Sequence, residues 1–588
     1  MEQHVFEESK KLLAKHEEME EELAAKIVSK LSSVIEPRYV SRDWAIRVAY
    51  SKDSSGSGSH DVNEYRIPDI VVLPGSAEDI VHVCKVASEH NVPVHVMSTN
   101  VNTAAMAIAL FRGIMIDLKR MNRVLEVDRD GLTLTVEPFV SYARAQAILE
   151  PYNLRINVPG APGSASVVGN NLYAGFKFFS GRFGYGAMET VGLEMVLPNG
   201  EIVRTGSLVN EPDLKTKSRE PGVRNEPELD GGRVSVQAWG PDLTGFPHQS
   251  VGGNGIVTKM CVKVYRRPEV IKILCHGFGS IENSVRVVTE AAEREIGFGG
   301  LIGVPEDNAL AAQHSNKDVE RVEATIKSKL KALMTGIKVM TKGRKYKDRE
   351  SYQEVFKGFL ALQGIKYVNL LFLMGTERKV KLDEKRFQDV LENKELNTEK
   401  IRDATDYQKH FFWPYSPDAD PESVYILMKN SGMEDYRYDW LIRGGKMLEY
   451  NEITARLMRK KGGLLFKSGR VAPSRVQECI DLFATTLEEF YPEAVKEHLW
   501  GLMILPGAGP HFACVEFVVQ IDPTSQREKD LSSKALREFT IRALNQGFYF
   551  FNHPKLEREV LERETMPKLW GLTKKIRDAF GATRLAPY

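Results

Sequence analysis

The stretch from Val158 to Gly175, VPGAPGSASVVGNNLYAG, concentrates small residues and little-shielded backbone in one place. It holds four glycines and two prolines and no charged side chain. Glycine permits turns with positive φ that aim several backbone N–H groups at one point, and such a concave set of donors binds anions. The stretch therefore indicates a phosphate-binding loop. A tight surface connection has a similar composition and stands as the alternative for the loop taken alone.

Three other segments carry side chains that can do chemistry, each with a structural alternative. In GFYFFNHP, Tyr549 and His553 are strong hydrogen-bond donors, although an aromatic core favours a simply hydrogen-bonded histidine. HFFWPYSPD, residues 410–418, either lines an aromatic pocket or fixes a loop on a core. The basic runs TKGRKYKDR and MRKKGG are typical of solvated faces, with an anionic substrate or partner as the weaker alternative.

Composition excludes several classes of protein. A chain of 588 residues suggests two to four domains. Its 80 basic and 79 acidic side chains leave a net charge of +1, which shows no electrostatic footprint for nucleic acid. The five cysteines lie far apart without a CxxC pair, so no disulfide framework or metal site is expected. The charged N-terminus and the lack of a long apolar run predict a cytoplasmic protein with no membrane span.

The periodicity of the chain predicts a mixed α+β fold. Residues 5–35 have apolar positions at helical spacing among charges, which predicts an amphipathic arm on the body or on a second subunit. SKDSSGSGSH, residues 51–60, has the composition of a flexible joint. Beyond it the pattern predicts the following elements: a strand at 69–74, a helix at 76–91, strands at 92–97, 113–118, 123–128 and 132–138, a helix at 141–153, a hairpin at 189–206 turned by Asn199 and Gly200, and a strand within 252–268.

Six blocks in this order carry a family resemblance: PDIVVLPGSAEDIVHVCKVASEHNVPV, IDLKRMNRVLEVD, TVEPFVSYARAQAIL, PGSASVVGN, GLEMVLPNGEIVRTG and GIVTKM. Together they resemble the FAD-binding domain of the vanillyl-alcohol oxidase and para-cresol methylhydroxylase superfamily, and the final TKKIRDAFGATRLAPY is similar to its returning terminal segment. The resemblance implies an α+β protein with a two-part FAD-binding domain and an α+β cap. It divides the chain into a helical arm and linker at 1–60, an FAD-binding domain at 61–268, a cap at 269–509 and a returning segment at 510–588.

The resemblance also implies which residues hold FAD. The loop along the pyrophosphate would be Pro159, Gly160, Gly163, Ser164, Gly169 and Asn170, and the adenosine strand would be Gly255, Ile256 and Val257. Relatives have a glycine-rich loop after the second strand, whereas this chain reads MSTNVNTAAMAIA, with no glycine. Ser98, Thr99, Asn100 and Asn102 are the donors that remain there.

The implied activity is an FAD-dependent oxidoreductase that moves a hydride from a small organic, aromatic or phenolic substrate to the flavin. The family's acidic residue, loop tyrosine and Tyr-Arg pair are not clear here, so Tyr549 and His553 are the nearest catalytic substitutes. Leu464 occupies the position where some relatives have a flavin-linked histidine, which predicts noncovalent FAD. A homo-oligomer or a partner subunit is expected. The alternative is a relative that lost flavin redox catalysis and serves as a binding or assembly protein or a non-redox enzyme.

Overall fold

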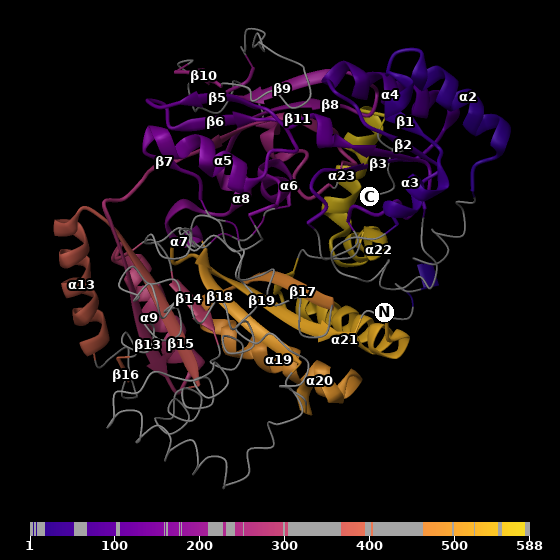
Figure 1. The fold of residues 1–588 in the computed structure, drawn as a ribbon. Coiled ribbons are helices and arrows are strands. Elements are labelled where there is room, and N and C mark those ends of the chain that lie inside the picture. The colour runs from indigo at the N-terminus through magenta and orange to yellow at the C-terminus, as the bar shows by residue number, and fades with distance from the viewer. Residues whose placement is uncertain are drawn as a thin grey trace, which may run out of the picture. The chain divides into compact units, whose positions relative to one another are not determined.

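The computed structural model describes residues 4, 7–8, 18–51, 67–101, 106–157, 159, 163–173, 175, 177, 179–209, 227–230, 242–250, 252–297, 300–303, 366–393, 402–403, 463–496, 499–507, 509–522, 524–550 and 555–581 (Figure 1). Two compact units result. The first unit contains residues 1–176, 185–267 and 522–588, and the second contains 177–184 and 268–521. The aromatic segment 410–418, the basic run 341–349 and most of the joint at 51–60 lie outside the described residues.

A mostly parallel sheet opens the first unit and confirms the predicted strand, helix and strand. Its order is β1-β2-β4-β3, where β2 and β3 both run parallel to β4 and β1 runs antiparallel to β2. β4 therefore lies between the two strands that the helix connects. The elements are β1 (Val40–Ser41), β2 (Ile70–Val72), α4 (Ala77–His90), β3 (Val94–Met97) and β4 (Ile114–Asp117).

Helix α4 has clear start and stop signals. The Ser76 hydroxyl accepts the Asp79 N–H at 3.1 Å, and the Asp79 carboxylate accepts the Gly75 N–H at 2.7 Å. Such a cap contributes about 1 kcal/mol. Asn91 ends the helix in the left-handed region at φ 54°. The buried face packs on the sheet through Ile80, Val83, Cys84, Val86 and Ala87.

A second sheet of the first unit has the order β10-β5-β6-β11-β8-β9. The predicted hairpin is confirmed, because β8 and β9 pair antiparallel across a turn in which Gly200 has φ 86°. Its strands are β5 (Val124–Asp128), β6 (Thr133–Val136), β8 (Thr190–Val196), β9 (Ile202–Gly206), β10 (Glu228–Leu229) and β11 (Ile256–Lys263). Around it lie α5 (Tyr142–Leu149), β7 (Leu154–Arg155), α6 (Val167–Leu172), α8 (Gly186–Glu189) and β12 (Tyr265–Arg266).

The C-terminal part of the chain returns to the first unit. It forms α21 (Gln526–Asn545), β20 (Tyr549–Phe550), α22 (Lys555–Thr565) and α23 (Pro567–Ala579). Phe580, after α23, packs edge-on against Phe246, with ring centroids 5.4 Å apart. No helix in the described part of the chain is long and apolar enough to cross a membrane.

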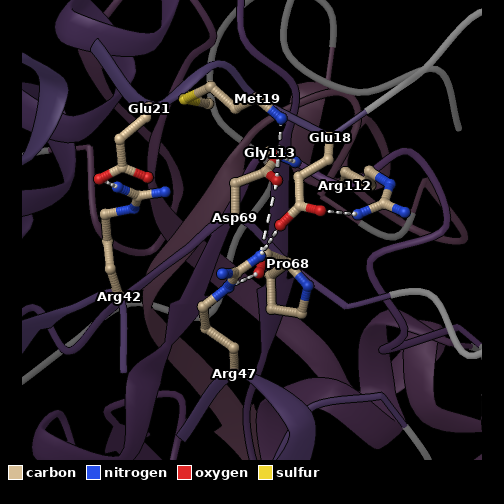
Figure 2. Close-up of polar contacts among 9 residues, drawn as sticks. All are labelled: Glu18, Met19, Glu21, Arg42, Arg47, Pro68, Asp69, Arg112 and Gly113. Atoms are coloured by element: carbon tan, nitrogen blue, oxygen red, sulfur yellow. Dashed lines mark hydrogen bonds and ion pairs between the residues drawn. The ribbon is translucent and has the colours of Figure 1, made fainter. Parts of the chain in front are cut away.

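The N-terminal arm differs from the expected continuous helix. Helix α2 (Glu21–Ser32) is present and buries Ala24, Ile27 and Leu31, but Glu18 to Glu20 are not helical. Contacts with the body explain the break, as Figure 2 shows. The Met19 N–H donates to Asp69 at 3.2 Å, and Glu18 accepts from Arg47 at 2.8 Å. Tertiary hydrogen bonds have replaced the helical ones.

Asp69 is the centre of that contact. Its carboxylate also accepts the Gly113 N–H at 2.7 Å and lies 3.8 Å from the Arg47 guanidinium, which donates in turn to the Pro68 carbonyl (Figure 2). Burial raises the pKa of the Asp69 carboxyl, and the backbone N–H groups of Gly113 and Met19 oppose that rise. One buried carboxylate thus joins α3 (Trp44–Ala49), the arm and the start of β4.

The second unit is built on an antiparallel sheet with helices on one face. Within this unit the strand order is β16-β13-β15-β14-β18-β19-β17. β13, α9, β14 and β15 repeat in the same order as β17, α19, β18 and β19, and the halves meet where β14 pairs with β18. The strands are β13 (Val270–Phe278), β14 (Gly300–Gly303), β15 (Tyr367–Gly375), β16 (Arg402–Asp403), β17 (Gly463–Val471), β18 (Trp500–Gly507) and β19 (Phe512–Ile521).

The two faces of this sheet are covered differently. Phe517 of β19 stacks on Phe483 of α19, with centroids 4.0 Å apart, so this face packs on helices. The opposite face receives the segment 177–184, where Phe179 packs edge-on against Phe372. The helices are α7 (Ser180–Phe183), α9 (Ile281–Glu293), α13 (Glu377–Glu392), α19 (Val476–Phe490) and α20 (Pro492–Lys496) (Figure 1).

Replacing the central carboxylate of the arm should destabilise the first unit. We expect Asp69→Ala to lower the free energy of unfolding by about 1–3 kcal/mol, because it leaves the buried Gly113 N–H and the half-buried Met19 N–H without their acceptor. Chemical denaturation measures this loss. Glu22→Ala, at an exposed position of α2, is the control and should change stability by less than about 0.5 kcal/mol. Equal effects of the two substitutions would contradict the prediction.

Candidate cofactor site

The glycine-rich loop is organised by Ser166, the residue that caps α6. Its hydroxyl accepts the Gly169 N–H at 2.9 Å and donates to the Pro138 carbonyl at 2.6 Å. The loop is also held from the neighbouring helix, because the Tyr142 hydroxyl donates to Asn170 Oδ1 at 3.1 Å. These hydrogen bonds hold the predicted loop in place at Ser166, Gly169 and Asn170.

The segment after β3 lies against this loop. The Ser166 N–H donates to the Thr99 hydroxyl at 3.0 Å, and a Cβ on Gly169 would lie 3.4 Å from the Ser98 hydroxyl. Asn100 adopts φ 54°, the left-handed conformation that asparagine tolerates better than most residues. The structure thus brings together Ser98 and Thr99 with the loop that the sequence analysis grouped with them.

The third predicted segment meets β3 as well. Gly252 precedes β11 with φ 84°, and a Cβ there would lie 2.4 Å from Val96 Cγ1 of β3. A small pocket forms at this contact, lined by Cys84, Val94, Val96, Val196, Pro198, Gly252, Gly255 and Ile256. Burial raises the pKa of the Cys84 thiol to about 12, so the thiol stays neutral in the pocket.

The other predicted residues are placed as follows. Gly163 and Pro159 are buried, Ser164 and Gly169 are exposed, and Asn170 is half-buried. Ile256 lines the pocket, whereas the Val257 side chain packs in the core, so only its backbone is a candidate for cofactor contact. Tyr549 is 40% exposed and lies between the buried Phe548 and Phe550. Asn102, Gly160 and His553 lie outside the described residues.

Asn157 is a polar residue of this region that sequence reasoning missed. It follows β7, two positions before Pro159, and is 0% exposed. Neither its Oδ1 nor its Nδ2 has a hydrogen-bond partner among the described residues. An unpaired buried amide costs about 1–3 kcal/mol, so its presence here fits a site whose polar ligand supplies the partner. Its signal in the sequence was only its place directly before the glycine-rich loop.

The donor set fits the diphosphate and ribose groups of FAD. Hydroxyls from Ser98 and Thr99, an orphaned amide at Asn157 and glycine backbone at Gly163 and Gly169 are neutral donors around one loop. Side chains after β3 replace part of the bare backbone that relatives use. The left-handed Asn100 supplies the turn there without glycine.

Comparison with known proteins agrees with this geometry. A family profile described as "FAD binding domain" matches residues 68–206. The chain is similar to the glycolate oxidase subunit GlcD of Bacillus subtilis, at 27% identity over 42% of this chain and 47% of the relative. It is also similar to the 4-cresol dehydrogenase flavoprotein subunit of Pseudomonas putida, at 28% identity over 36% of this chain and 37% of the relative. The matched segments span less than half of each curated relative.

A solved structure extends the likeness in fold. The 4-ethylphenol oxidase of Gulosibacter chungangensis, in complex with isoeugenol, matches with a TM-score of 0.68 at 17% identity, covering 96% of this chain and 97% of that one. Residues 68–206 form an FAD-binding domain of the vanillyl-alcohol oxidase and para-cresol methylhydroxylase type, and the chain shares its fold with the 4-ethylphenol oxidase. FAD is the cofactor that its first unit takes.

Asn157 provides a test of the cofactor site that separates binding from folding. We expect Asn157→Leu to weaken FAD binding about tenfold to a hundredfold, the equivalent of one hydrogen bond to a buried group. The melting temperature of the FAD-free protein should stay equal or rise, because a buried unpaired amide is removed. Fluorescence titration of FAD and thermal melting measure the two effects. With Asn122→Ala as control, a lower melting temperature and unchanged FAD affinity would make Asn157 a structural residue.

Proposed function

We propose that the protein is an FAD-dependent oxidoreductase that takes a hydride from a small organic substrate. The observation that carries this proposal is the meeting of Ser98 and Thr99 with the Ser166–Gly169 segment of the glycine-rich loop. The unpaired buried amide of Asn157, two positions before Pro159, supports it. When bound, FAD supplies the two-electron acceptor, while the chain supplies binding, orientation and proton handling.

Names of relatives support a hydroxyl-bearing substrate. The Bacillus subtilis relative is named for glycolate, the Pseudomonas putida relative for 4-cresol, and the structural relative for 4-ethylphenol. All three molecules carry a hydroxyl whose proton leaves when the molecule is oxidised. We therefore propose a small alcohol, 2-hydroxy acid or phenol as substrate. Two of these relatives are named as subunits, which supports a partner subunit as part of the proposal.

The spectrum of the purified protein tests the proposed function. We expect a flavin absorbance that bleaches when glycolate or 4-ethylphenol is added without oxygen. A colourless protein that also fails to bind added FAD would favour the alternative, a family member that lost flavin redox catalysis and serves as a binding or assembly protein or a non-redox enzyme.

Noncovalent attachment of FAD is a separate prediction. Strand β17 contains Leu464 and no histidine, so it offers no ring nitrogen to bond to the flavin. We expect acid precipitation of the yellow protein to leave all flavin in the supernatant. Fluorescence that stays with the chain in a denaturing gel would contradict this prediction.

Tyr549 and His553 remain the proposed donors to charge that develops on the substrate. Removing one preorganised donor typically lowers a rate about a hundredfold or more. We expect Tyr549→Phe or His553→Ala to slow flavin reduction by this factor while FAD stays bound, as measured by anaerobic stopped-flow absorbance. Lys534→Met, on α21 of the same unit, serves as the surface control. Reduction at the parent rate in both variants would assign these residues to packing.

A further inference from the structure

The C-terminal end of α23 lies against the turn that precedes β11. Arg577, in the last turn of α23, is 6% exposed, and a Cβ on Gly253 would lie 3.3 Å from its Nη2 atom. The same Cβ would lie 3.0 Å from the Ser250 carbonyl oxygen. Glycine at position 253 therefore leaves the space in which the Arg577 guanidinium approaches the backbone of the turn.

Two more contacts place the same end of α23 on neighbouring segments of the first unit. Phe580 packs edge-on against Phe246, with ring centroids 5.4 Å apart. A Cβ on Gly581 would lie 3.7 Å from the Cβ of Asn199, in the turn between β8 and β9. The end of α23 thus contacts both the segment 246–253 and the turn at Asn199.

Both of these segments continue into the small pocket beside β3. Pro198 directly precedes Asn199, Gly252 directly precedes Gly253, and Pro198 and Gly252 line the pocket. The Gly253 N–H donates to the Ser250 carbonyl at 2.8 Å, which closes the turn. Neighbouring residues share a planar peptide unit, so a shift of Gly253 also moves Gly252. The position of the end of α23 therefore affects the shape of the pocket.

The rest of α23 is held weakly. The structure describes all of this helix, and Arg577 is its only buried residue. Leu569 and Leu572, nearer its start, are 56% and 57% exposed. Elements with few buried contacts open at a lower free energy than the core of a domain. Docking of α23 therefore depends largely on the contacts at its C-terminal end, and a ligand can shift its equilibrium.

We propose that Arg577 is a positioning residue through which FAD binding and the docking of α23 depend on each other. This inference rests on the proposed function and on Gly255 and Ile256 as the adenosine side of the cofactor site. Arg577 acts on the turn rather than on FAD: its guanidinium holds Gly253, and the turn in turn holds Gly252 and Gly255 at the pocket. Because linkage is reciprocal, FAD favours docked α23 by the same factor by which docked α23 favours FAD.

Substitutions of Arg577 test this role by fluorescence titration of FAD. Arg577→Met removes the guanidinium and keeps a long side chain, and we expect it to weaken FAD binding about tenfold, within the range typical of coupled sites. Arg577→Lys keeps the charge without the planar group and should lie between Arg577→Met and the parent. Lys575→Met, at an exposed position of the same helix, is the control and should bind FAD as the parent does.

Gly253→Ala tests the same contact from the side of the turn. Gly253 does not have a positive φ, so its backbone accepts alanine, and the new Cβ should displace the guanidinium and weaken FAD binding. If both substitutions break one contact, the double variant should bind FAD no more weakly than the weaker single variant. Additive losses would mean that Gly253 and Arg577 act independently, which would contradict the positioning role.

Hydrogen exchange measures the coupling in the unaltered protein. Saturating FAD should slow amide exchange in residues 567–579 about tenfold in the parent and in Lys575→Met, and should leave it unchanged in Arg577→Met. Thermal melting of the FAD-free proteins shows whether each variant is folded. Neither measurement depends on turnover.

The outcomes separate this inference from the proposed function. Parent-like FAD affinity in Arg577→Met would overturn the role of Arg577 and leave the oxidoreductase standing. Exchange in α23 that does not respond to FAD in the parent would overturn it as well. A lower melting temperature with unchanged FAD affinity would assign Arg577 to stability alone. No FAD binding by the parent would remove both the inference and the proposed function.

Discussion

The hydrogen bond from the Ser166 N–H to the Thr99 hydroxyl joins segments 67 positions apart, and the cofactor region depends on it. Ser166 also bridges Ser141 through its backbone and holds the Pro138 carbonyl and the Gly169 N–H through its hydroxyl. One residue therefore sets the distance between the end of β3, the start of α5 and the loop before α6. Moving β3 by one residue would turn Val96 away from Gly252 and separate the pocket from the loop.

The segment after β3 contains no glycine, and Asn100 adopts the left-handed conformation that glycine would otherwise supply. A left-handed residue is needed where the backbone turns away from the sheet, and Asn100 takes that conformation at φ 54°. Asparagine accepts this region at a small cost, because its short polar side chain bonds to nearby groups. The segment can therefore keep its course while its side chains, rather than bare backbone, face the glycine-rich loop.

Buried polar groups divide into two kinds. Asp69 and Glu194 are surrounded by backbone N–H groups, guanidinium or ammonium groups, and they hold elements together. Asn157, Gln520 and Glu516 lack such complete partners among the described residues. The first kind stabilises the fold in the absence of ligand. The second kind costs free energy in the protein alone, and it occurs after β7, at Asn157, and on β19, at Glu516 and Gln520.

The sequence by itself determined the type and order of the elements in the first unit. Periodicity, the Ser76 cap and the turn at Gly200 are local signals, and ordered motifs were sufficient to identify an FAD-binding domain before any contact was known. Local signals could not show that β4 lies between β2 and β3, because strand order depends on packing between distant segments. They also predicted one continuous helix through Glu18 to Glu20, but this segment is not helical, because Met19 and Glu18 form hydrogen bonds to Asp69 and Arg47 instead.

Asn157 and Glu516 resemble ordinary polar residues in the sequence. Only the tertiary structure decided that both are buried, because burial is set by the neighbours that folding brings from elsewhere in the chain.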